Sequence, residues 1–231
     1  MTSAQLISWV VSAITFGTVI MFGCIGETIN QKAGNLNLGI PGIMQLGGIG
    51  ALTGAFIYES STATPNGTIG MICALLCAIL ASALGSLIYS FLTVTLKANQ
   101  NVTGLTLTIF GTGIANFFGG SLMKLSGGVG SISVATTANV FKLRLPFISG
   151  KLGLFGSLFL NYGWMAYFCL VLAFVANYFL TKTRTGLNLR AVGENPATAD
   201  AAGINVTKYK YLASIVGGAI CGLGGLFYVM D

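Results

Sequence analysis

Titratable side chains are few in this sequence, and their types limit the chemistry that it can perform. Its 231 residues contain no histidine, and the five acidic residues are Glu27, Glu59, Glu194, Asp200 and Asp231. All five are expected outside the apolar spans or at their ends, so no buried carboxylate relay for protons is predicted. A membrane-embedded enzyme would need clustered acids, histidines or a reactive serine beside a base, and none is visible. The chain also lacks the Gly-x-x-x-x-Gly-Lys-Ser/Thr loop that binds ATP phosphates.

The five cysteines favour neither a disulfide framework nor a metal site. They are Cys24, Cys73, Cys77, Cys169 and Cys221, an odd number lying mostly within apolar runs. Cys73 and Cys77 are one helical turn apart, but no histidine or third cysteine lies near them in the sequence. We therefore predict buried small apolar side chains, and we expect neither a metal nor a cofactor.

Residues 26–45 combine polar side chains with helix-breaking residues at the entrance of an apolar segment. Gly34, Gly39, Pro41 and Gly42 lie in this segment together with Asn35 and Asn37. Broken backbone at membrane depth is tolerated only where it lines a cavity or is covered by protein, and interrupted spans are typical of transport sites. A tight cytoplasmic turn in front of an ordinary helix explains the same residues equally well.

Residues 182–210 form a polar connection that contains signals for a short helix. Asn195 is suited to cap this helix, Pro196 to begin it and Gly203 to stop it. The residues between them are small, so the helix can lie along a membrane surface and fit the cleft of a partner. A docking helix is favoured over a plain linker.

The elements that must position these residues are transmembrane helices. The chain is 54% hydrophobic and only 7% charged, whereas soluble domains carry about 25% charged residues. Charge-free windows longer than the roughly 20 residues that cross a bilayer predict helices rather than barrel strands. The predicted fold is an all-α polytopic bundle in one domain, with about six spans, a discontinuous second span and a short cytoplasmic helix. The spans lie near 5–25, 37–58, 68–96, 102–121, 161–181 and 210–230, with an outer segment over 122–160 and a cytoplasmic loop over 182–209.

The positions of Lys and Arg predict that the N-terminus lies outside the cell. In that orientation the inner connections hold seven of them, namely Lys32, Lys97, Lys182, Arg184, Arg190, Lys208 and Lys210. The outer segment holds Lys124, Lys142, Arg144 and Lys151, and a long segment counts weakly in the positive-inside rule. No cleavable signal peptide is expected, because the first apolar run is long enough to remain as a span. The net charge of +6 is therefore attributed to topology and not to nucleic acid binding.

Small residues recur four positions apart in three of the predicted spans. The pairs are Gly50 with Gly54, Ala81 with Gly85, and Gly218 with Gly222. Such faces let helices approach closely in lipid, where packing replaces the hydrophobic drive between helices. We favour packing within this chain over homodimerisation as the use of these faces.

The two polar segments carry motifs that occur together in one protein family. The first is Gly26-Glu27 followed by the run from Lys32 to Gly39, and the second runs from Thr185 through Arg-Ala-Val-Gly-Glu-Asn at 190–195 to Ile204. Together they resemble the permease subunits of ATP-binding-cassette (ABC) importers, in the branch that handles sugars, nucleosides and branched-chain amino acids. The similarity extends over nearly the whole chain and is strongest to nucleoside-type permeases and the ribose permease.

This resemblance implies a transport subunit of a bacterial plasma membrane, with no enzymatic activity of its own. It implies a homo- or heterodimer of permeases, two ATP-binding subunits and an extracellular substrate-binding lipoprotein, within membrane lipid. Closure of the ATPases would push the short helix near 195–203, here the coupling helix, and swing the bundle from inward-open to outward-open. The residues assigned to coupling are Arg190, Gly193, Glu194, Asn195, Asp200 and Gly203. For Glu194 and Asp200, a solvated loop charge is the alternative.

The implied translocation path needs uncharged hydrogen-bonding groups, because a neutral sugar or nucleoside must pass without a deep binding well. Six side chains inside or beside the spans supply such groups: Asn35, Asn37, Gln45, Thr106, Thr108 and Asn116. For the last four, packing or hydrogen bonding back to their own helix is an alternative explanation.

Two departures from the family pattern affect these expectations. Pro41 stands where nucleoside-type members often have an acidic residue, which weakens the choice of substrate. The chain ends at Asp231, directly after the sixth span, whereas family members continue, so a truncated chain is expected. Branched-chain amino acids are therefore an alternative substrate. A channel or structural membrane protein outside the ABC class is the alternative function, and a channel would need no docking loop.

Overall fold

The computed structural model describes residues 3–125, 132, 134–143 and 162–231. Most of the predicted outer segment 122–160, with Arg144 and Lys151, lies outside these residues, as does residue 161 at the start of the predicted fifth span. The described helices are α1 (Ser3–Lys32), α2 (Ile40–Ser61), α3 (Gly67–Ser90), the π-helical turn η1 (Phe91–Thr95), α4 (Gln100–Leu125), α5 (Ala135–Phe141), α8 (Trp164–Lys182), α9 (Arg184–Glu194), α10 (Pro196–Ala201) and α11 (Val206–Met230).

The prediction of an all-α bundle with six spans is confirmed. Six of the described helical stretches are long and apolar enough to cross a membrane, and α3 forms one of them together with η1. Two boundaries differ from the prediction. α1 continues to Lys32 instead of ending near residue 25, and α2 begins at Ile40 and is uninterrupted. The interruption of the second span therefore lies before α2, over residues 33–39, and not within it.

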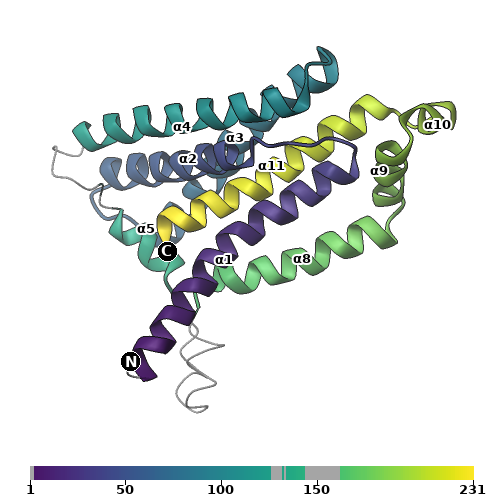
Figure 1. Cartoon of the computed structure of the whole chain (residues 1–231). Helices are drawn as coiled ribbons and strands as arrows, with labels where there is room; N and C mark the ends of the chain where they lie inside the picture. Colours follow the sequence, from purple (N-terminus) through teal and green to yellow (C-terminus); the bar gives the residue numbers. More distant parts are fainter. Residues whose placement is uncertain (1–2, 126–131, 133, 144–161) are drawn as a thin grey trace.

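Consecutive spans run in alternating directions, so the connections gather at two ends of the bundle. α9 and α10 lie together at one end, whereas both chain termini and α5 lie toward the other (Figure 1). α11 is the central helix and packs against α1, α2 and α3. Within the described residues, 61% of its span is buried, against 22–44% for the other five spans.

Side-chain caps define where several of these helices begin. Asn66 accepts a hydrogen bond from the backbone N of Thr68 at the start of α3, and Asn205 accepts one from Lys208 at the start of α11. Thr183 accepts one from Gly186 at the start of α9. Such caps satisfy backbone amides that have no partner inside the helix, and they fix each helix end at a polar connection.

The predicted pairs of small residues are used for packing inside the chain. Gly50 and Gly54 of α2 face Cys77 of α3, and Cβ atoms at these glycines would lie 2.8 Å from its carbonyl oxygen and 2.7 Å from its sulfur. Gly218 and Gly222 of α11 abut serine side chains of α3. These faces therefore bring α2, α3 and α11 together, as predicted.

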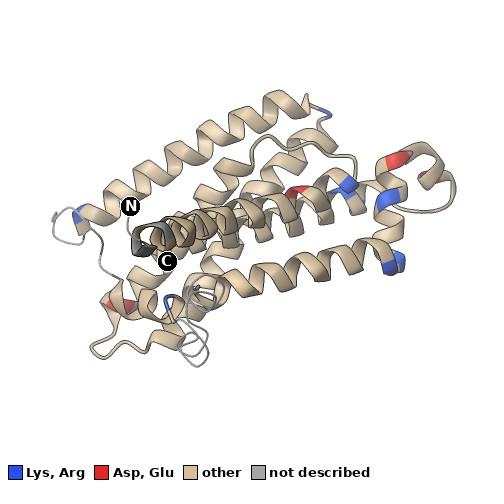
Figure 2. Cartoon of the chain, turned by 60° about the horizontal axis from the view of Figure 1, so that its bottom comes forward, with Lys and Arg blue, Asp and Glu red and all other residues tan. Residues whose placement is uncertain are grey.

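The Lys and Arg residues gather mainly at the end of the bundle that carries α9 and α10 (Figure 2). Seven of those described lie at this end: Lys32, Lys97, Lys182, Arg184, Arg190, Lys208 and Lys210. Lys124 and Lys142 lie at the opposite end, in the last turn of α4 and directly after α5. The cations are thus separated along the axis of the bundle in the way that the sequence predicted.

Two expectations about single residues require correction. Glu27 was expected outside the first span, but α1 carries it inside the helix, and its side chain is half-buried. Cys24 is exposed and Cys73 and Cys77 are only partly buried, whereas Cys169 and Cys221 are buried as expected. Within α1, the Glu27 carboxylate has a hydrogen-bond partner, the backbone amide of Asn37, which lies ten residues further along the chain in the connection between α1 and α2.

Candidate functional site

The connection 33–39 folds back into the bundle after α1 ends. The backbone N of Asn37 donates a 3.0 Å hydrogen bond to Oε1 of Glu27. Glu27 lies five residues before the end of α1, which corresponds to about 7–8 Å along the helix axis. Ala33, Asn35 and Asn37 are 0%, 1% and 5% exposed. This re-entry covers irregular backbone with protein, the condition under which membrane proteins tolerate it.

Three further helices hold the middle of this connection. Tyr89 of α3 donates a 2.6 Å hydrogen bond to the carbonyl oxygen of Leu36, while the Leu36 amide donates to Oε1 of Gln100 at the start of α4. Asn35 donates through Nδ2 to the carbonyl oxygen of Lys210 in α11, at 3.3 Å. Together with Glu27 of α1, these bonds tie one short segment to four of the six spans.

The end of the connection packs directly on the backbone of α4. A Cβ at Gly39 would lie 2.9 Å from the carbonyl oxygen of Gly104, so the two chains meet without side chains between them. The Thr108 hydroxyl donates to the carbonyl oxygen of Leu38 at 3.1 Å. Oδ1 of Asn37 accepts a 2.8 Å hydrogen bond from the Gly39 amide directly before α2, and α2 has a proline in its first turn.

The other end of the connection touches α9, again backbone to backbone. A Cβ at Gly193 would clash with the carbonyl oxygen of Lys32 and lie 2.9 Å from the amide nitrogen of Gly34. Gly34 has φ +78°, a left-handed conformation that disfavours side chains. Glycine is therefore required on both sides of this contact, for space at Gly193 and for backbone conformation at Gly34.

α10 has the cap and the stop that the sequence predicts. Asn195 accepts a hydrogen bond from the Thr198 amide at 3.1 Å, and Pro196 occupies the first turn. Gly203 follows with φ +81°, and its amide donates to the carbonyl oxygen of Asp200 at 2.9 Å. Glu194 and Asp200 are exposed and Arg190 is half-buried, so the acidic side chains are available to a partner. Their role in coupling stays a prediction.

The predicted pathway residues fall into three groups, of which Gln45 alone forms the third. Asn35, Asn37 and Thr108 meet at the connection 33–39, as described above. Thr106 and Asn116 are exposed on α4, and the Thr106 hydroxyl donates to the Val102 carbonyl oxygen one turn earlier. Thr108 makes a similar bond to Gly104. These bonds match the alternative of hydrogen bonding within the helix, and a role in a path stays a prediction.

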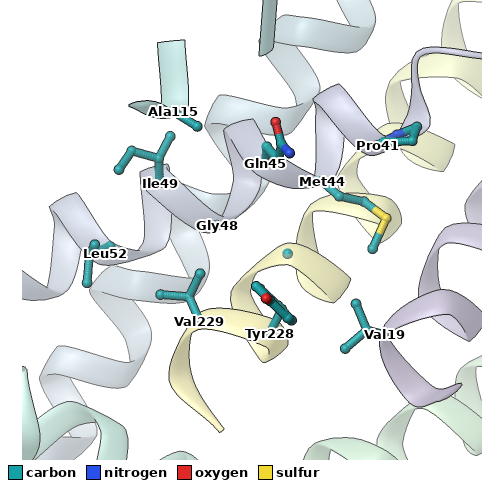
Figure 3. Close-up of a pocket in the computed structure, with 11 residues that line it drawn as sticks. Val19, Pro41, Met44, Gln45, Gly48, Ile49, Leu52, Ala115, Tyr228 and Val229 are labelled. Atoms are coloured by element: carbon teal, nitrogen blue, oxygen red, sulfur yellow. The ribbon is translucent and has the colours of Figure 1, made fainter. Parts of the chain in front are cut away.

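Gln45 lines a cavity of about 340 Å³ between α1, α2, α4 and α11 (Figure 3). It is the one side-chain amide in the lining, and Tyr228 contributes the one hydroxyl. The other lining residues are Val19, Pro41, Met44, Gly48, Ile49, Leu52, Ala115, Gly225 and Val229. Small-molecule sites have this size and this mainly apolar lining with a few polar groups. None of the described residues that line it is charged, which favours an uncharged molecule.

Sequence reasoning missed α9 and the partners of the connection. Gly186, Leu189 and Val192 of α9 are buried and lie three residues apart, a helical spacing that the sequence displays. Glu27 belongs to a quoted motif, but its bond to Asn37 does not follow from the motif. Nothing in the sequence indicates the role of Tyr89, because its hydrogen-bond partner Leu36 lies 53 residues away.

Comparison with known families decides the assignment. Residues 9–231 match the family described as "Branched-chain amino acid transport system / permease component". The chain belongs to this permease family. The predicted resemblance is thereby confirmed, and the six spans are those of a multi-pass membrane permease.

Several relatives of this permease are named for the transport of sugars or nucleosides. It is 32% identical to a protein of Haloferax volcanii provisionally named a glucose ABC transporter permease, over 93% of this chain and 60% of that protein. It is 29% identical to a nucleoside ABC transporter permease of Lactococcus lactis, over 95% of this chain and 66% of the relative. For a guanosine ABC transporter permease of Bacillus subtilis the identity is 27%, over 99% and 69%. The chain thus spans roughly two thirds of the length of these relatives. No solved structure matches it significantly.

Proposed function

We propose that this permease forms part of the translocation path of an ABC importer for a neutral nucleoside or simple sugar. The contact of Gly193 with the connection 33–39 carries the proposal, because it joins the candidate coupling segment to the interrupted entrance of the second span. In this proposal, ATP-binding subunits dock on α9 and α10, and a second permease subunit and an extracellular binding protein complete the complex.

The orientation of the chain follows from its charges. The end with α9 and α10 carries seven of the nine described Lys and Arg residues, and Lys and Arg are retained on the cytoplasmic side of membrane proteins. We therefore assign this end to the cytoplasm and the N-terminus to the outside. This orientation also puts the docking segment on the side of the membrane where ATP is available.

The choice of a neutral substrate rests on the cavity beside Gln45. The described lining is almost entirely apolar and contains no charged side chain, so it lacks the ion pairs that would hold a charged amino acid. The named functions of the relatives, for glucose, nucleosides and guanosine, point the same way. A branched-chain amino acid would bring a carboxylate and an ammonium group into this lining, and no described residue there would neutralise either charge.

Two measurements on the native complex test the proposal. First, an ATPase should co-elute with the permease, and Asp200→Lys should weaken this association, because it reverses a charge exposed on α10. Lys124→Glu is the matched control, since it reverses an exposed charge at the opposite end and should leave co-elution intact. A permease that elutes without an ATPase would remove the importer assignment and favour a channel.

Second, vesicles that contain the complex should take up labelled nucleoside or pentose when ATP is supplied, and should not take up labelled leucine. Asn37→Ala should change the rate or the selectivity, because Asn37 holds the start of α2 through Gly39. Gln45→Leu should change selectivity through the cavity lining. Identical profiles for both variants and the wild type would leave the connection and the cavity without a role in the path.

A further inference from the structure

A second cavity, separate from the one beside Gln45, opens between α8, α9 and α11. It has a volume of about 550 Å³, and its lining includes Phe179, Leu189, Leu212, Val216, Tyr209 and Lys208. Val216 is 48% exposed and Leu212 is also 48% exposed, so the cavity is a groove open to the surroundings of the bundle. Because α8 and α11 are long and apolar enough to cross a membrane, we infer that lipid surrounds this groove.

The groove is apolar along its length and cationic at one end. Lys208 is the charged residue among the described residues of its lining, and Arg184 is the neighbour of the lining residue Thr185 without lining the groove itself. No Asp or Glu occurs among the described residues that line it. Tyr209 anchors this end, since its hydroxyl accepts a 3.1 Å hydrogen bond from Nδ2 of Asn188. Lysine and tyrosine are residues that place a polar tip at the membrane interface above an apolar stem.

We propose that this groove binds one anionic phospholipid, with an acyl chain against Phe179, Leu189 and Leu212 and the headgroup phosphate at Lys208. The charge pattern selects this occupant. A two-fold dimer through the same face would bring two copies of Lys208 together at the groove end, whereas an anionic headgroup complements this charge. Juxtamembrane Lys and Arg residues attract the anionic lipids of the cytoplasmic leaflet in the same way.

The bound lipid contacts α9 directly. Thr185 and Leu189 of α9 line the groove, and Gly193 of the same helix contacts the connection 33–39. The lipid therefore packs against α9, which together with α10 is the docking site that we propose for an ATPase. Lipid binding itself needs no ATPase, so its test is independent of the proposed function.

Native mass spectrometry of the purified chain tests the site with two lipids that share the same acyl chains. Titration should show one phosphatidylglycerol bound in preference to phosphatidylcholine. Lys208→Gln should lower the affinity for phosphatidylglycerol by about five-fold, the contribution of one Lys near a membrane surface, and leave phosphatidylcholine unaffected. Lys97→Gln is the matched control, because Lys97 is exposed at the same end of the bundle but lies outside the lining.

Equal affinities of the wild type for the two lipids would overturn the proposal. So would an equal loss for Lys208→Gln and Lys97→Gln, since it would indicate a general effect of surface charge. A photo-crosslinker in place of Val216 identifies the occupant: capture of phospholipid supports the site, whereas capture of a second copy of the chain contradicts it. Ala213→Trp, which fills the groove, should reduce binding of both lipids, and the Lys208 pair keeps the test valid if this variant does not fold.

Discussion

Replacing Gly193 with alanine puts a methyl group between α9 and the connection 33–39. The new carbon would lie 2.9 Å from the amide nitrogen of Gly34 and closer still to the carbonyl oxygen of Lys32, whereas ordinary contacts begin at 3.4 Å. Both neighbours are backbone atoms, so no side chain can rotate away. Overpacking of this kind costs about 1–3 kcal/mol.

This strain is confined to the conformation in which α9 and the connection touch. If the transporter alternates between two conformations and the contact forms in one of them, a bias of about 1–3 kcal/mol shifts their equilibrium by about 5- to 150-fold. The gain in helix propensity from alanine applies to both conformations and does not offset the shift. We therefore expect Gly193→Ala to affect the amount of substrate taken up per ATP hydrolysed more strongly than the thermal unfolding of the protein.

The assay is uptake and ATP hydrolysis measured on the same proteoliposomes, with thermal unfolding measured in parallel. Gly113→Ala is the matched control, because it makes the same chemical change inside α4 where nothing lies within 4 Å of the new carbon. An uptake-to-hydrolysis ratio for Gly193→Ala equal to those of the wild type and the control would refute the coupling role of this contact.

Three further variants test individual interactions. Glu27→Gln should lower the free energy of unfolding by about 1 kcal/mol, because the 3.0 Å bond to the Asn37 amide loses its ionic acceptor; thermal unfolding in detergent measures this. Gly222→Leu should lower it by about 3 kcal/mol or more, since the side chain would meet Ser82 of α3; the yield of monodisperse protein measures the loss. Asn195→Ala should weaken the start of α10 locally by about 1 kcal/mol, visible as faster hydrogen exchange there with little change in global unfolding.

The first two of these variants have a control that leaves their contact untouched. Glu194→Gln removes the same charge from an exposed site and should leave unfolding unchanged. Gly113→Leu adds the same side chain where a Cβ meets nothing within 4 Å. Equal destabilisation by a variant and its control would show that the assigned contact contributes nothing specific.

The helices of this fold could be predicted because lipid imposes the same requirement at every position. A charge-free window longer than 20 residues must satisfy its backbone internally, so composition alone marks a span. The bounds of α10 could also be predicted, because its capping signals, Asn195 with Pro196 and later Gly203, are local in the sequence. The end of α1 could not, because Glu27 stays in the helix through a bond to a segment that folds back onto it.

The candidate site was only partly visible in the sequence. Asn35 and Asn37 could be selected because they lie among helix-breaking residues, but their partners are distant. The backbone amide of Leu36 donates a hydrogen bond to the side chain of Gln100, 64 residues away. The side-chain amide of Asn35 donates one to the carbonyl oxygen of Lys210, 175 residues away. Such distant pairs cannot be found from a single sequence. The helix α9, by contrast, could have been predicted, because its buried residues recur every three positions in the sequence.

Contacts between glycines and backbone atoms link α9 to the connection 33–39, and the connection to α4. Gly193 meets the connection at Gly34, and the other end of the connection meets α4 at Gly39 and Gly104. A side chain between two helices can change rotamer and absorb a displacement of several tenths of an ångström, whereas backbone in contact with backbone has no such freedom. A movement of α9 must therefore displace the connection, and through it α4, or break the hydrogen bond from Asn37 to Glu27. This is the physical reason to place the coupling of the two sites in residues 33–39, and not in the longer polar loop alone.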